Sequence, residues 1–229
     1  MNDVEFLARM ICAQMDEGVP VVLASIVDLQ GSSPRHLGTK MIVDGQGKSY
    51  GTIGGSLLEA EVIREAKAAL LAERSQMMAF DLVGDNVHSP EMICGGKAVI
   101  LLDFLPATPE NIECFRAFYD MVRAGCDFHF LTVFRDAHHA IDVLGHTLLL
   151  PGGKTVGHYA WQDAKLTTVQ AEAAAISSTA VVAMHEVRVV IDPIKKIQTL
   201  FCFGAGHVAL PTAHVAALVR RAGALPAGV

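Results

Sequence analysis

The sequence lacks the features of a membrane or exported protein. Its 229 residues contain no run of about 18 apolar residues, the length that a membrane-spanning helix requires. The first ten residues carry Asp3 and Glu5, where a signal peptide would be basic. We therefore expect a cytoplasmic protein that does not bind a membrane.

The chain also has few basic residues, and they are not clustered. It contains 18 Lys and Arg against 24 Asp and Glu, which gives a formal net charge of -6, and the basic residues form no long run. A protein that binds nucleic acid must neutralise phosphates, which requires a basic patch or stripe. Nucleic acid is therefore not an expected partner.

Motifs for metal binding and for hydrolysis are absent as well. The five cysteines are an odd number without CxxC spacing, and the ten histidines form no HExxH motif. These absences disfavour a disulfide framework and a zinc site. No serine lies in the GxSxG context of a nucleophile elbow. We expect no metal held by protein ligands, and we assign no catalytic residue.

The sequence does have enough apolar residues, 52% of the chain, to build a packed core. A Ser56-x-x-Glu59 pattern predicts a capping box at the start of one helix. Helical patterns and β patterns predict an α+β domain with a mixed sheet and flanking helices over residues 1–195. The expected helices are 2–17, 57–73, 108–125 and 167–176, and the expected strands are 19–28, 40–44, 77–83, 97–105, 127–135, 140–150, 154–159 and 186–194.

The last segment, 196–229, carries a pattern typical of a nucleotide-binding fold. Residues 199–203 read as a buried strand, and Gly204, Gly206 and Ala209 then form a G-x-G-x-x-A turn before a helix. His207 at that turn is a candidate for facing a phosphate. We predict the first βα unit of an incomplete α/β Rossmann domain. NAD is an unlikely ligand, because no second strand supplies the acidic residue that binds the ribose.

Two glycine-rich loops are candidate anion sites. The loop 31–41 places Ser32, Ser33, Arg35 and Lys40 together, a set of hydroxyls and cations that can bind a phosphate. In the loop 51–59, Gly54 and Gly55 precede a helix, whose free N–H groups an anion can approach closely. The alternative is a pair of tight turns with solvated charges.

A third loop, MICGG at 92–96, carries a candidate thiol. Cys94 is followed by Gly95 and Gly96, so its thiol can be exposed, and nearby backbone N–H groups can lower the pKa of such a thiol. The site could then carry or receive sulfur. The alternative is a buried structural cysteine, the common fate of this residue type, which we also expect for Cys12, Cys114 and Cys202.

Taken together, the loops resemble a known family. The stretches GSSPRHLGTKMIVDGQGKSYGTIGGSLLEAEV, MICGG and LFCFGAGHVA occur in the order and approximate spacing seen in the xanthine dehydrogenase accessory (XdhC/CoxI) family. Two departures stand out: Ser56 replaces a third glycine, and members usually continue after GAGHVA through further βα units. We therefore expect a C-terminally truncated form of the family's Rossmann domain.

The resemblance implies an accessory chaperone rather than an enzyme. The resemblance implies that the protein binds the molybdenum cofactor (molybdopterin) transiently, while a cysteine desulfurase installs the terminal sulfur of the cofactor. The protein would then deliver the cofactor to an apo molybdenum hydroxylase of the xanthine dehydrogenase type. The implied cofactor-binding residues are those of the three loops together with Gly204, Gly206 and His207. Two alternatives remain open, an NAD(P)-dependent oxidoreductase and a degenerate interaction fragment without cofactor. A homodimer is a further expectation.

Overall fold

The computed structural model describes residues 3–31, 35–81, 96–137, 140–158, 163–196, 203–204 and 206–221. The chain divides into two compact units, residues 1–195 and residues 196–229. Each unit is described by itself below. No helix in the described ranges is long and apolar enough to cross a membrane.

The first unit is built on two five-stranded sheets. In the first sheet the strand order is β3-β2-β1-β5-β4, and in the second it is β8-β7-β6-β10-β9. The strands are β1 Val21–Gly31, β2 Lys40–Asp44, β3 Ser49–Gly51, β4 Gln76–Asp81, β5 Gly96–Leu105, β6 Phe128–Ala137, β7 Ala140–Leu149, β8 Thr155–Gly157, β9 Ala180–Met184 and β10 Val187–Ile194. Every described ladder is antiparallel, so the predicted mixed sheet was wrong.

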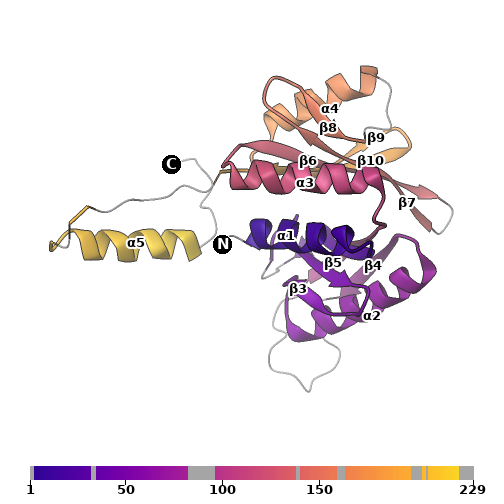
Figure 1. The fold of residues 1–229 in the computed structure, drawn as a ribbon, viewed down its shortest axis with the longest axis horizontal. Coiled ribbons are helices and arrows are strands. Elements are labelled where there is room, and N and C mark those ends of the chain that lie inside the picture. Colours follow the sequence, from indigo (N-terminus) through magenta and orange to yellow (C-terminus); the bar gives the residue numbers. More distant parts are fainter. Residues whose placement is uncertain are drawn as a thin grey trace. The chain divides into compact units, whose positions relative to one another are not determined.

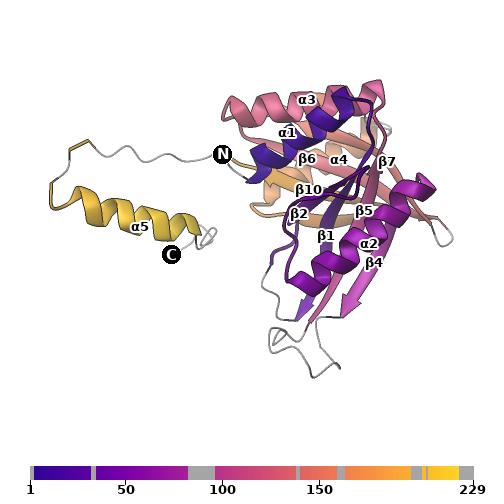
Figure 2. The same cartoon turned by 60° about the horizontal axis from the view of Figure 1, so that its bottom comes forward.

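Four helices of this unit form layers with the sheets: α1 Asp3–Asp16, α2 Ser56–Ala72, α3 Pro109–Arg123 and α4 Asp163–Ala175. Figures 1 and 2 show α2 on one sheet and α4 on the other, with α1 and α3 side by side between the sheets. The buried clusters agree, because α2 packs on the first sheet, α4 on the second, and α1 and α3 share one core with both.

Strand β1 shows why these layers follow from the sequence. Its residues alternate between two buried environments: Val22 and Ala24 pack in the core beneath α2, whereas Val21 and Leu23 pack toward α1 and α3. Both faces of the strand are covered, which explains why Val21–Val27 is apolar except for Ser25, without the alternation of a half-exposed strand.

The N-terminus of α3 agrees with the sequence prediction, whereas that of α2 does not. The predicted start of the helix 108–125 is confirmed at α3, where the Thr108 hydroxyl accepts a hydrogen bond from the Asn111 N–H and Pro109 lies in the first turn. At α2, the N-cap is Gly55, which has no side chain to cap with, so the capping box predicted from Ser56 was wrong. The Glu59 carboxylate instead bonds to groups that precede the helix, as described below.

Two short strands escaped the sequence analysis. Strand β3 has three residues, and β9 has the sequence AVVAM, which is too short and too rich in alanine to give a distinct β signal. Both are edge strands whose conformation depends on pairing, with β2 and with β10 respectively.

In the second unit, the described residues include the helix α5 Ala209–Arg221. The predicted strand 199–203 lies outside the described residues except for Phe203, which is not in a strand. The Rossmann unit therefore stays a prediction.

An ion pair joins the two sheets of the first unit. Lys40 Nζ on β2 lies 2.5 Å from Asp192 Oδ2 on β10, and the two side chains are only 16% and 12% exposed. The Thr179 hydroxyl donates to Asp192 Oδ1 at 2.6 Å, and Lys40 also donates to the Gly38 carbonyl at 3.0 Å. Both charges are thus paired within a largely buried layer.

Substitution Asp192→Ala is expected to reduce the free energy of unfolding by about 3 kcal/mol, because it leaves the Lys40 ammonium without a counter-ion in that layer. Urea denaturation measures the change. As a control, Asp142→Ala removes the partner of Arg135 in a pair whose side chains are almost half exposed, and it should cost less than about 1 kcal/mol. Equal effects of the two substitutions would contradict the structural role given to Lys40 and Asp192.

Candidate ligand-binding site

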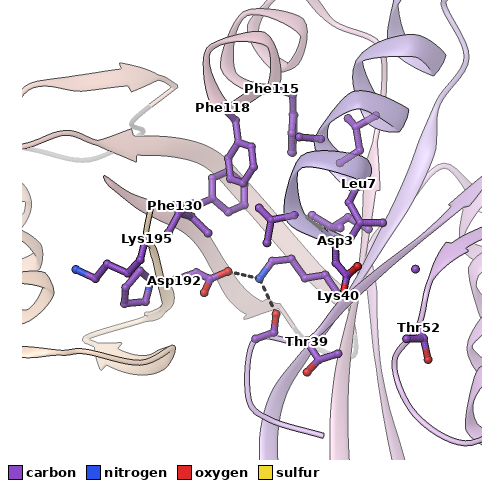
Figure 3. A pocket seen from close by; sticks show the side chains of 18 of the residues that line it. Asp3, Leu7, Thr39, Lys40, Thr52, Phe115, Phe118, Phe130, Asp192 and Lys195 are labelled. Carbon is purple, nitrogen blue, oxygen red and sulfur yellow. Dashed lines mark hydrogen bonds and ion pairs between the residues drawn. The ribbon is translucent and has the colours of Figure 1, made fainter. Parts of the chain in front are cut away.

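A pocket of about 410 Å³ lies beside the Lys40–Asp192 pair (Figure 3). We call it the central pocket. Helices α1 and α3 and strand β6 form one side, and the chain on either side of β2 forms the other. It is defined by Leu7, Phe115, Phe118 and Phe130 on its apolar side and by Arg35, Lys40, Thr52 and Asp192 on its polar side.

The apolar side is mainly aromatic. The rings of Phe118 and Phe130 meet edge to face with centroids 5.1 Å apart, and Phe115 lies 5.7 Å from Phe130. Edge-to-face contacts of this kind hold aromatic rings in fixed relative orientations. Figure 3 shows Phe118 and Phe130 beside the Lys40–Asp192 pair, with Thr52 on the opposite side. We call the set Phe115, Phe118 and Phe130 the aromatic wall.

On the polar side, the first two glycine-rich loops come together. Arg35 Nη2 donates to the Thr52 hydroxyl at 3.0 Å, which joins the loop 31–41 to the loop 51–59. The Thr52 hydroxyl in turn makes a short hydrogen bond to the Glu59 carboxylate, and the Gly54 N–H donates to the same carboxylate oxygen at 3.4 Å. The two loops singled out in the sequence therefore meet through the predicted Arg35, although its partner Thr52 and the Glu59 carboxylate were not predicted as site residues.

These contacts change the role of the two glycines before α2. The Gly54 N–H, expected to bind an anion, faces the chain's own Glu59 carboxylate. Gly55 is exposed, and a Cβ at this position would meet no atom within 4 Å, so the backbone there is open to approach. Neither glycine lines the central pocket. An anion in that pocket would instead meet Arg35.

The charge of the central pocket is slightly positive. Its lining contains three basic side chains, Arg35, Lys40 and Lys195, and two acidic ones, Asp3 and Asp192. The Lys40 charge is offset by Asp192, so Lys40 is less available to a ligand than the sequence suggested. An excess of one positive charge next to an apolar wall suits a ligand that is aromatic at one end and anionic at the other.

Gly38 is required for this arrangement of the loop. Its φ of +83° lies in the left-handed region, and a Cβ at this position would overlap the Thr179 side chain. Because Thr179 also donates to Asp192, the close approach of Gly38 keeps Thr179, Asp192 and Lys40 together at the edge of the central pocket.

Gly96 of the third loop does not line the central pocket. Gly96 begins β5 opposite Gly31 of β1, so the third loop leads into the same end of the sheet as the first. Ser32, Ser33, Cys94 and Gly95 lie outside the described residues. Gly204, Gly206 and His207 belong to the second unit. Among the described residues there is no group of three or more His, Cys, Asp or Glu that could hold a metal ion.

Two buried carboxylates of the inter-sheet layer, those of Asp192 and Asp103, were not predicted from the sequence. Asp192 interrupts the apolar run VRVVIDPI, and Asp103 interrupts KAVILLDFL. A carboxylate within a buried strand needs a partner, so each interruption was a usable signal. The partners, Lys40 and His146, lie more than 40 residues away and cannot be identified from these patterns alone.

Part of the first unit matches a known family. Residues 14–81 match the model of the XdhC and CoxI family. We call residues 14–81 the XdhC and CoxI segment because they are similar to that family. The resemblance carried by the first two glycine-rich loops is therefore confirmed, since both loops lie within the segment.

The relatives are distant and longer. The uncharacterized protein YqeB of Escherichia coli K12 is 31% identical over 87 residues, which are 38% of this chain and 16% of YqeB. A Bacillus subtilis protein described as a probable xanthine dehydrogenase subunit is 23% identical over 209 residues, 91% of this chain and 59% of that protein. The chain thus spans about a sixth and about three fifths of these relatives.

A crystal structure of a xanthine dehydrogenase from Bacillus halodurans has a similar fold. The TM-score is 0.60 at 21% identity, with 84% of this chain and 53% of that chain covered. At this identity the comparison concerns the fold alone, and it extends beyond the XdhC and CoxI segment into the second sheet.

The XdhC and CoxI segment supplies only part of the central pocket. Arg35, Lys40 and Thr52 lie within residues 14–81, whereas the aromatic wall and Asp192 lie outside them. The pocket therefore forms only when the second sheet and α3 pack against the segment.

Two cysteines near this pocket, the half-buried Cys12 and the buried Cys114, are poor nucleophiles. Burial raises the pKa of the Cys12 thiol to about 11, with a further contribution from Asp16, and raises the pKa of the Cys114 thiol to about 12. Both are therefore protonated at neutral pH, as expected for core cysteines. A sulfur-handling role would have to fall on another cysteine.

We expect Cys12 to be alkylated about 100-fold more slowly in the folded protein than in urea at about pH 8, because its thiolate fraction falls with a pKa raised by roughly two units. Iodoacetamide labelling with mass spectrometry, in a chain whose Cys94, Cys126 and Cys202 are serine, measures the ratio. The folded pKa exceeds the unfolded one, so the stabilising effect of the neutral thiol is complete below about pH 9 and is lost toward about pH 11. Equal rates in the two states would contradict this burial.

Proposed function

We propose that the protein is an accessory factor for a molybdenum hydroxylase of the xanthine dehydrogenase type, with the central pocket as its site for the molybdenum cofactor. In this role it binds the cofactor while a cysteine desulfurase supplies the terminal sulfur, and it then transfers the cofactor to the apo-enzyme. The proposal is supported by the XdhC and CoxI segment and by the name of the Bacillus subtilis relative.

The observation that carries the proposal is the position of Arg35. This residue of the family segment is held by Thr52 at the edge of a pocket whose opposite side is aromatic. Guanidinium groups bind phosphate through paired N–H donors, and aromatic side chains suit a flat heterocycle. The volume of about 410 Å³ lies within the range of small-molecule sites. The residues present thus fit a pterin that carries a phosphate.

The chain's own part in this function is to bind and protect. Arg35 would hold the anionic end, the aromatic wall would cover the ring, and Leu7 and Ile11 of α1 would exclude water. The bound group supplies its redox chemistry only in the client enzyme. Cys94 is proposed as the thiol that assists sulfur transfer, because the described Cys12 and Cys114 remain protonated.

Arg35→Ala is expected to raise the Kd for molybdenum cofactor about tenfold, the effect of losing one charge-assisted hydrogen bond. Binding to the 229-residue chain is followed anaerobically by pterin absorbance. Arg64→Ala is the matched control, because Arg64 is exposed on α2, pairs with Glu61 and Glu65, and does not line the pocket. Its Kd should be unchanged.

The same titration tests the alternatives. A folded wild-type chain that binds no cofactor would overturn the proposal in favour of an interaction fragment, and tight NAD binding by calorimetry would favour an oxidoreductase. If cofactor binds but Cys94→Ala delivers sulfurated cofactor to apo-enzyme as well as the wild type, Cys94 has no part in the transfer.

A further inference from the structure

A second buried polar pair lies behind the aromatic wall. His146 Nε2 on β7 and Asp103 Oδ2 on β5 are 2.7 Å apart, and the two side chains are 4% and 2% exposed. The Ser75 hydroxyl lies 3.5 Å from the other carboxylate oxygen of Asp103 and accepts a hydrogen bond from the Phe104 N–H at 2.9 Å. The Asp103 carboxylate is thus held by Ser75 through one oxygen, and it holds the His146 ring through the other.

The imidazole of His146 supports two rings of the aromatic wall. It is stacked on Phe130, with centroids 5.7 Å apart and an interplanar angle of 8°, and it lies 5.6 Å from Phe115 at 51°. Phe115 and Phe130 line the central pocket, whereas His146 does not. His146 therefore contacts the pocket only through these rings.

One nitrogen of His146 has no hydrogen bond to any residue that the structure describes. Nδ1 is buried and has no partner among the described residues. With Nε2–H donating to Asp103, Nδ1 is a buried acceptor with no donor among the described residues, which is unfavourable. An apolar residue would avoid this cost, but it would lack the hydrogen bond that fixes the plane of the ring. A buried polar group kept in this way calls for an explanation beyond packing.

We propose that His146, held by Asp103, is a positioning residue that sets the ring planes of Phe130 and Phe115, so that the central pocket receives the planar ring of its ligand against the aromatic wall and the anionic end at Arg35. This inference rests on the proposed function and adds the orientation of the ligand. Recognition of the ligand's ring then depends on the His146–Asp103 pair, which lies outside the XdhC and CoxI segment.

The test compares two probes, one with a ring and one without. Pterin-6-carboxylate is planar, anionic and fluorescent, and inorganic phosphate is anionic only. Asp103→Leu removes the acceptor for His146 and should weaken pterin-6-carboxylate binding about fivefold, in line with the loss of one oriented aromatic contact. Phosphate binding, measured by competition or ³¹P line broadening, should change less than about twofold, because Arg35 is untouched.

The conservative variant separates positioning from stability. Asp103→Asn keeps an oxygen that can accept from Nε2–H, so it should restore pterin-6-carboxylate binding and keep the Nε2–H tautomer, as seen by ¹⁵N NMR of His146. Val189→Ala weakens the core beneath α4, away from the pocket, and should leave both probes unchanged. If Asp103→Leu does not fold, Phe130→Leu removes the stacked ring itself and should show the same selective loss.

Equal weakening of both probes, or wild-type affinity of Asp103→Leu or Phe130→Leu for pterin-6-carboxylate, would overturn the inference. A different outcome rejects the proposed function itself: the wild-type chain then binds neither molybdenum cofactor nor pterin-6-carboxylate. Binding of both by the wild type, with no selective loss in the variants, rejects only the role of His146.

Discussion

The ion pair between Lys40 and Asp192 is the constraint on which the first unit depends. It joins strands of different sheets in a layer where an unpaired charge would be costly, so the sheets must meet in a register that brings these two residues together. Gly38 and Thr179 both support this pairing. Gly38 lets the loop 31–41 approach Thr179 closely, and the Thr179 hydroxyl donates to the second carboxylate oxygen of Asp192. The edge of the central pocket is a consequence of that geometry.

The same constraint explains why the family segment does not form a site by itself. Lys40 lies within residues 14–81, but its counter-ion and the aromatic wall come from the second sheet and α3. The segment supplies cationic and hydroxyl groups, and the rest of the unit supplies the apolar side and the compensating charge. A ligand that is aromatic at one end and anionic at the other would be bound by both parts at once.

Local signals in the sequence predicted local structure well. Strand β2 was predicted to the residue, and the start of the predicted helix 108–125 was correct, because each depends on neighbours a few positions away. The Ser56-x-x-Glu59 pattern failed because Glu59 found competing donors in Thr52 and Gly54, which the spacing of a capping box does not consider. The partners of Asp192 and His146, by contrast, lie on strands distant in the sequence. Alternation places Asp192 and His146 on an inner face, but it does not identify their partners.

The position of Glu59 also decides which part of the glycine-rich loops can recognise an anion. A helix N-terminus preceded by two glycines suggests that the backbone binds phosphate, yet here a carboxylate from the helix itself already accepts from the Gly54 N–H. The same carboxylate bonds to Thr52, and Thr52 accepts from Arg35, so the negative charge of Glu59 orients the guanidinium through one hydroxyl. In the proposed site the loop would therefore contact a ligand through the Arg35 guanidinium, not through the backbone of Gly54.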